Sequence, residues 1–141
     1  MEFLTRQEYH QKKWKKIFGK EDCPFCYIKK NEIYWKGNFW YLTFALTPYS
    51  WDERHLMAIP YEHIIYSYDL TLEHFQELLE VQKIVKDFFK EEDYFSFTRE
   101  SLANRSIEHL HIHFLVWRLK WKFLRKMLEL QWFPIKEDLN I

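Results

Sequence analysis

Three histidines alternate with aliphatic residues in the segment His109-Leu110-His111-Ile112-His113. Successive side chains of a β-strand point to opposite faces, so this pattern predicts a strand with the imidazoles on one face and the aliphatic residues on the other. Imidazole is the side chain whose ordinary pKa lies nearest to neutral pH, and it can act as a nucleophile, a base or a proton donor. The row therefore predicts a reactive face; the alternative is a histidine-rich exposed strand.

The spacing of this row limits what its members can do together. Neighbouring histidines would lie about 6.6 Å apart and the outer pair about 13 Å apart, at a rise of about 3.3 Å per residue. A zinc ion binds its ligands at about 2.0 to 2.3 Å, so it cannot collect all three from one straight strand. At least one imidazole is therefore expected to remain available for other chemistry.

The two cysteines of the chain, Cys23 and Cys26, stand in the sequence Cys-Pro-Phe-Cys. This spacing indicates a metal site or a redox pair. A redox pair needs surroundings that lower the thiol pKa, whereas Glu21 and Asp22 precede the cysteines and raise it. The pattern favours zinc over redox chemistry, an inert pair remains open, and a zinc site needs two further ligands.

Composition excludes several classes of protein. A length of 141 residues predicts a single domain over residues 1–141, and 21 basic residues balance 21 acidic ones, so no net charge recruits nucleic acid. Two isolated glycines, Gly19 and Gly37, cannot build a phosphate-binding loop of the Walker or dinucleotide type. The sequence has no signal-peptide pattern and no transmembrane segment, so we expect a soluble, cytoplasmic protein.

Apolar periodicity predicts an α+β fold. A helical stripe fits residues 71–91, where Asp69 or Thr71 can cap the helix start and Glu73 suits its positive end. Leu110, Ile112 and the following Phe114 would pack against this helix. The expected strands cover residues 33–35 and 39–46, joined as a hairpin through 36–38, and residues 54–59, 94–98 and 108–117; a first helix covers 5–18 within an N-terminal segment of residues 1–20.

The C-terminal extension, residues 118–141, begins with basic residues interleaved with aromatic and aliphatic ones. Such a segment can contact RNA, an anionic membrane surface or a partner protein. A solvated cationic face with its aromatic residues packed inward is commoner. RNA or membrane contact by this segment therefore stays open as the less favoured alternative.

Taken together, these motifs resemble the histidine triad (HIT) superfamily. The matching parts are the cysteine pair, the segment from His55 to His63 with its Ile-Pro-x-x-His element, the long helix and the segment from Ser106 to His113, so the likeness spans residues 23–117. The resemblance implies a HIT-like fold: an antiparallel sheet of about five strands, a long helix packed across it, and additional N- and C-terminal helical segments. It also implies a homodimer as the common assembly.

The resemblance assigns roles to the row. His111 would attack the α-phosphorus of a nucleotide substrate, and water would hydrolyse the resulting nucleotidyl-histidine. His113 would help bind phosphate or handle the leaving group, and Ser106 matches a residue that contacts either of them. The implied activity is that of a nucleotide hydrolase or transferase acting on a phosphoramidate or phosphoanhydride bond.

The pattern of zinc-containing relatives identifies the two missing metal ligands as histidines. By resemblance, the zinc would be held by Cys23, Cys26, His63 and His109. A closed site with four protein ligands is structural, because it leaves no position for substrate. The alternative is that the two histidines only form hydrogen bonds in the interior.

Departures from the family pattern concern the substrate. Ala45 stands where relatives often have an acidic residue that holds the ribose hydroxyls, and the approach to the triad lacks the usual glycines. In this approach we expect Thr98, Asn104 and Arg105 to contribute to phosphate binding, Arg105 through charge-assisted hydrogen bonds. The alternative function is a catalytically weak, zinc-stabilised module on the same scaffold that binds nucleotide or RNA.

Overall fold

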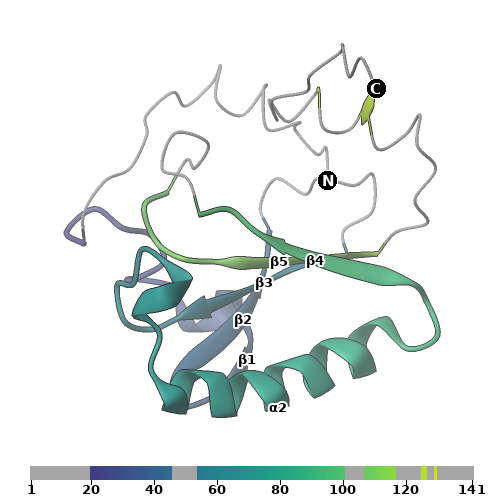
Figure 1. Cartoon of the computed structure of the whole chain (residues 1–141), viewed down its shortest axis with the longest axis horizontal. Helices are drawn as coiled ribbons and strands as arrows, with labels where there is room; N and C mark the ends of the chain where they lie inside the picture. The colour runs from purple at the N-terminus through teal and green to yellow at the C-terminus, as the bar shows by residue number, and fades with distance from the viewer. Residues whose placement is uncertain (1–19, 46–53, 101–106, 117–124, 127–128, 130–141) are drawn as a thin grey trace.

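The computed structural model describes residues 20–45, 54–100, 107–116, 125–126 and 129 (Figure 1). Their main feature is an antiparallel sheet whose five strands lie in the order β1-β2-β3-β5-β4. One long helix, α2, lies across one face of this sheet (Figure 1). The elements are β1 (Ile33–Lys36), β2 (Trp40–Phe44), β3 (His55–Pro60), α2 (Leu72–Phe89), β4 (Tyr94–Thr98) and β5 (Ile112–Val116), with short 3₁₀ turns at Lys30–Glu32 and Ser67–Asp69.

The predicted fold class is confirmed. Strands β1 and β2 form the expected hairpin, β4 has the predicted bounds, and β3 and α2 differ from prediction by one or two residues at their ends. Thr71, one of the two proposed caps, is the N-cap of α2: its side chain accepts a hydrogen bond from the backbone N–H of His74, and the His74 ring accepts one from the Thr71 N–H.

A carboxylate from α2 fastens the hairpin turn to the helix. Glu77 accepts hydrogen bonds from three consecutive backbone N–H groups, those of Asn38, Phe39 and Trp40, at 2.6 to 2.7 Å. The approach is so close that a Cβ on Gly37 would lie 2.6 Å from the Glu77 carboxyl carbon. A side chain at position 37 would therefore push the Glu77 carboxylate out of its present position against the turn.

We expect Glu77→Ala to lower the free energy of unfolding by about 2–3 kcal/mol, because three backbone donors lose a charged acceptor. Glu80→Ala, an exposed glutamate on the same helix, is the matched control and should change it by less than about 0.5 kcal/mol. Urea unfolding of both variants measures the difference. Equal stability of the two variants would show that the contact adds nothing.

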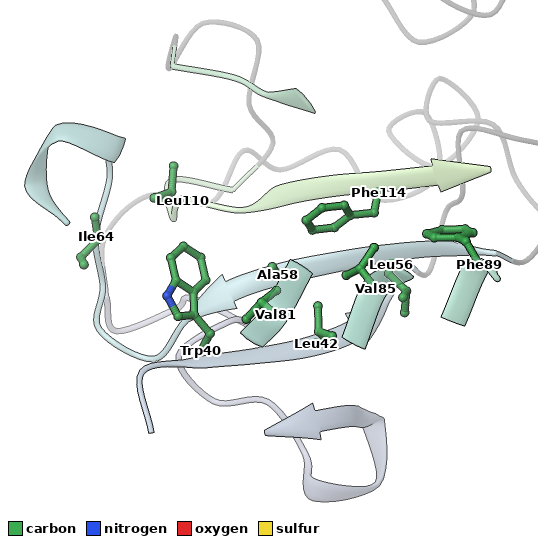
Figure 2. Packing of buried hydrophobic residues seen from close by; sticks show 10 residues of the cluster. All are labelled: Trp40, Leu42, Leu56, Ala58, Ile64, Val81, Val85, Phe89, Leu110 and Phe114. Carbon is green, nitrogen blue, oxygen red and sulfur yellow. The ribbon is translucent and has the colours of Figure 1, made fainter. Parts of the chain in front are cut away.

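The hydrophobic core lies between α2 and the sheet. Strand residues of alternating positions meet Val81, Val85 and Phe89 of the helix, all of which are buried (Figure 2). Leu110 and Phe114 belong to this cluster and Ile112 packs against it, which confirms the predicted aliphatic face of the histidine segment. The buried members are Trp40, Leu42, Leu56, Ala58, Ile64, Val81, Val85, Phe89, Leu110 and Phe114.

A second, smaller buried cluster lies on the other face of the sheet. It joins Tyr41, Met57 and Ile59 of β2 and β3 to Cys23 and Phe25 of the cysteine segment. The Tyr41 hydroxyl donates a hydrogen bond of 2.6 Å to the backbone carbonyl of Phe25. The sheet thus separates a helix-covered core from a face that carries the cysteine segment.

The strand predicted over residues 108–117 is shorter than expected. Strand β5 begins at Ile112, so His109 and His111 precede it. The reason is a competing backbone partner: the N–H of Leu110 donates to the carbonyl of Ile64 at 2.7 Å, which is not a contact of the β3–β5 ladder. The row is therefore not one straight strand, although its alternation between the two faces persists.

Several predicted elements fall outside the described residues: the helix over 5–18, the loop after β2, and most of the C-terminal extension. Of that extension, the structure describes Arg125, Lys126 and Glu129, all helical, with an ion pair between Arg125 and Glu129. Among the described residues, no helix is both long and apolar enough to cross a membrane.

Candidate metal and histidine site

The cysteine segment, the loop after β3 and the segment before β5 bring four predicted metal ligands together. The ligand atoms of Cys23, Cys26, His63 and His109 all lie within 4.8 Å of one another. Nδ1 of His109 is 3.3 Å from Sγ of Cys23 and 3.5 Å from Sγ of Cys26. Nδ1 of His63 is 3.2 Å from Sγ of Cys26.

These separations fit a tetrahedral zinc ion. Zinc–sulfur bonds of about 2.3 Å and zinc–nitrogen bonds of about 2.0 Å at tetrahedral angles place sulfur and nitrogen about 3.5 Å apart. The donor set of two thiols and two imidazoles is one that zinc prefers in closed structural sites. The residues present therefore suit zinc by both geometry and chemistry.

Backbone contacts orient His109 for this role. Its Nε2 lies 2.8 Å from the carbonyl oxygen of Pro60, and because a carbonyl only accepts, Nε2 must carry the proton. Nδ1 is then the basic nitrogen of the neutral ring, and it faces the two thiols. The bond from Leu110 to Ile64 ties the segments of His109 and His63 to each other. Such outer contacts fix the orientation of a ligand before the metal arrives.

The surroundings of Cys26 and His63 determine which of these side chains must lose a proton when a metal binds. Burial raises the pKa of the Cys26 thiol to about 11, with the hydrogen bond and charge of Cys23 adding to the effect. Burial lowers the pKa of His63, although the charge of Glu108 opposes this shift. At neutral pH His63 is thus an uncharged ligand, and a metal that binds Cys26 must release its proton.

His111 lies next to this cluster and is partly exposed. Its Nδ1 lies 2.7 Å from the carbonyl oxygen of His109, so Nδ1 carries the proton and the neutral ring keeps a basic Nε2. The ring of Phe25 contacts it edge-on with centroids 5.1 Å apart, and contacts His109 at 5.9 Å. Phe25 of the cysteine segment thus contacts the rings of both His109 and His111.

His113, at the other end of the row from His109, is also buried. Its ring meets that of His111 at 4.7 Å and stacks on Phe97 of β4, with centroids 4.6 Å apart and planes 15° from parallel. Its Nδ1 is 2.8 Å from Nε2 of His55, a buried histidine of β3. The row thus consists of three histidines in different environments rather than three equivalent groups.

The other predicted substrate contacts are less well placed. Thr98 pairs with Ile112 in the β4–β5 ladder, whereas Phe97 pairs with His113, so Thr98 and His113 point to opposite faces of the sheet. Ser106, Asn104 and Arg105 lie outside the described residues. Ala45 packs against the cluster around Phe25 and Met57. A role in phosphate binding for Thr98, Asn104, Arg105 and Ser106 remains a prediction.

Sequence reasoning missed three residues that line the row: Phe25, Phe97 and His55. The sequence contained a signal for His55 alone. This histidine alternates with Met57 and Ile59 in an apolar strand and must therefore share their face. Which strand lies beside β3 depends on pairing between residues far apart in the sequence. That pairing, not the local pattern, brings His55 to His113.

The family model that describes scavenger mRNA decapping enzyme C-term binding matches residues 22–128 of this chain. The match contains the four clustered ligands and the whole histidine row. The chain belongs to this family of the histidine triad superfamily. The family match covers the likeness seen in the sequence over residues 23–117 and extends beyond it at the C-terminal end.

Solved structures of HIT proteins share this fold. A HIT family hydrolase from Clostridium thermocellum is 25% identical, with a TM-score of 0.57 over 71% of this chain and 94% of that one. A zinc-bound histidine triad family protein from Mycobacterium smegmatis is 20% identical, with a TM-score of 0.59 over 74% and 81% of the two chains. A histidine triad nucleotide-binding protein from Candida albicans is 19% identical, with a TM-score of 0.57 over 77% and 93%. No curated protein matches the chain.

Proposed function

We propose that this HIT protein is a nucleotide hydrolase or transferase that cleaves a phosphoramidate or phosphoanhydride bond through a covalent nucleotidyl-histidine. The observation that carries the proposal is the hydrogen bond from Nδ1 of His111 to the carbonyl of His109. When this partly exposed imidazole is neutral, the bond leaves its Nε2 as a nucleophile that needs no metal. The family match and the similarity to a HIT family hydrolase support it.

The reaction would proceed in two displacements at phosphorus. Nε2 of His111 attacks the α-phosphorus, a phosphorus–nitrogen bond forms, and the bond to the leaving group breaks while His113 gives that group a proton. Water then attacks the same phosphorus, passes a proton to His113 and releases the nucleoside monophosphate from His111. Water thus returns to His113 the proton that His113 gave to the leaving group, so that the catalyst is regenerated.

Zinc has a structural role in this proposal. Cys23, Cys26, His63 and His109 would hold it with all four positions occupied, so that it fastens the cysteine segment to the histidine segment. The zinc-bound relative from Mycobacterium smegmatis supports this assignment. The ion contributes no step to the reaction.

The test is turnover of adenosine phosphoramidate and of a dinucleoside polyphosphate by the purified chain, combined with mass spectrometry of acid-quenched samples. We expect nucleoside monophosphate as product and a protein mass increased by one nucleotidyl group. Absence of both product and adduct over a broad panel of nucleotides would refute the proposed enzymatic activity. Nucleotide binding without product would favour the alternative of a binding module on the same scaffold.

A further inference from the structure

The outer nitrogens of the two histidine ligands have unequal surroundings. Both rings face the thiols through Nδ1. Nε2 of His109 lies 2.8 Å from the carbonyl oxygen of Pro60. Nε2 of His63, in contrast, is buried and has no hydrogen-bond partner among the residues that the structure describes. The cluster of metal ligands is thus supported from outside at one imidazole and not at the other.

Metal binding makes this missing partner costly. A neutral histidine that binds zinc through Nδ1 must carry its proton on Nε2. A buried N–H group without an acceptor loses its hydration and gains no hydrogen bond in exchange. For this reason, metal-bound histidines almost always donate their second nitrogen to a carboxylate, a backbone carbonyl or a water molecule. The zinc-loaded site therefore needs an acceptor beside Nε2 of His63.

The fold brings a carboxylate to this place. Glu108 directly precedes His109, whose ring meets that of His63 edge-on with centroids 5.0 Å apart. The hydrogen bond from the N–H of Leu110 to the carbonyl of Ile64 holds the two segments side by side at this point. Glu108 is partly exposed, so its side chain can change rotamer without disturbing the buried core.

The charges around the ligands agree with this placement. Burial has the largest influence on the pKa of His63 and lowers it, whereas the charge of Glu108 raises this pKa and that of Lys20 lowers it. Burial and Cys23 raise the pKa of Cys26 to about 11, and the charge of Lys20 opposes that shift. The carboxylate therefore lies within electrostatic reach of the imidazole, and the ammonium group within reach of a thiol that zinc would convert to a thiolate.

We propose that Glu108 is the outer partner of the zinc site and that its carboxylate accepts a hydrogen bond from Nε2–H of His63 in the zinc-loaded protein. This bond would hold the tautomer whose Nδ1 is available to zinc and make that nitrogen more basic. Glu108 touches neither zinc nor nucleotide; it is a positioning residue that acts through His63. The inference rests on the structural zinc of the proposed function but not on its reaction, so it can be tested without turnover.

Two variants separate the hydrogen bond from the charge. Glu108→Gln keeps a side-chain carbonyl oxygen that can accept from Nε2–H but has no charge, and Glu108→Ala has neither. The matched control is Glu21→Ala, which removes an exposed carboxylate two residues before Cys23. The charge of Glu21 is not among those that shift the pKa of His63. The zinc dissociation constant of each full chain is measured by competition with a chromogenic chelator at constant pH.

We expect Glu108→Ala to weaken zinc binding about 10- to 100-fold, as loss of an outer contact does at other metal sites, and Glu108→Gln to weaken it less than about 5-fold. Glu21→Ala should change it by less than about 2-fold, because salt screens exposed charges at a distance. Unchanged affinity in Glu108→Ala would overturn the inference. Equal weakening by Glu108→Ala and Glu108→Gln would also overturn it, since charge alone would then act.

Nuclear magnetic resonance of the ring N–H groups tests the contact directly in the zinc-loaded chain. We expect the Nε2–H proton of His63 to be shifted downfield and to exchange slowly with water, and both properties to be lost in Glu108→Ala while circular dichroism shows an unchanged fold. The same Nε2–H signal in both proteins would identify another acceptor and refute the role of Glu108. A chain that binds no zinc would refute it as well. Zinc affinities in the expected order without any nucleotide turnover would leave this inference standing while the proposed reaction fails.

Discussion

We expect replacement of His111 with asparagine to lower nucleotide turnover by about 10³-fold or more, because loss of a catalytic nucleophile typically removes most of the rate enhancement. The asparagine amide can still donate to the carbonyl of His109, as Nδ1 of the imidazole does. It offers no nucleophilic nitrogen in place of Nε2. We therefore expect a folded protein that binds nucleotide but forms no covalent adduct.

Steady-state turnover and the mass of the acid-quenched protein test whether this variant still reacts. Urea unfolding tests whether it is still folded. The control is His74→Gln, because His74 is a buried histidine, 2% exposed, on α2, which packs against the other face of the sheet. Its turnover per folded molecule should equal that of the unmodified protein. Retained turnover or a retained nucleotidyl adduct in the asparagine variant would rule out His111 as the nucleophile.

Removing one metal ligand has the second large expected effect, this time on stability. Protein prepared without chelators should contain about one zinc ion per chain, and Cys23→Ser or Cys26→Ser should remove most of it. A ligand present at about 1,000 times its dissociation constant stabilises a fold by about 4 kcal/mol. Loss of this stabilisation should lower Tm by about 10–15 °C for a domain of this size.

The control for the cysteine variants is Tyr27→Ser. Tyr27 is 65% exposed and follows Cys26 directly, so its replacement alters the same segment without touching a ligand. Elemental analysis gives the zinc content, and calorimetry with and without chelator gives the difference in Tm. A native preparation that holds no zinc, or a Tm that chelator leaves unchanged, would exclude the structural zinc site.

The sequence predicted most of the fold because its elements carry strong local signals. The stripe of apolar residues in α2, with Thr71 before it, specifies both the helix and its start, and the turn at Gly37 specifies the hairpin. The end of β5 nearest His109 was predicted wrongly, since a backbone bond between Leu110 and Ile64 replaces the ladder there. Such a contact leaves no mark in the local pattern of side chains.

The site was predictable to a different extent. The cluster of four metal ligands is assembled as the resemblance to zinc-containing HIT proteins implied, whereas the cysteine spacing alone indicated only two of the four. The partners of the row were not, since His55 and Phe97 reach His113 only through strand order. A homodimer, a cytoplasmic location, and the roles of residues 1–20 and 118–141 remain predictions.

The division of the buried residues into two clusters on opposite faces of the sheet has a consequence for change over evolution. The helix-covered cluster contains none of the metal ligands or row histidines, so much of the folding stability does not depend on which molecule the other face accepts. Under the proposed function, we therefore expect substitutions around Ala45 and Phe97 to alter substrate preference at little risk to the helix-covered core. The same separation would then make this chain a practical scaffold for selecting, in the laboratory, variants with new preferences among phosphoramidate and phosphoanhydride substrates.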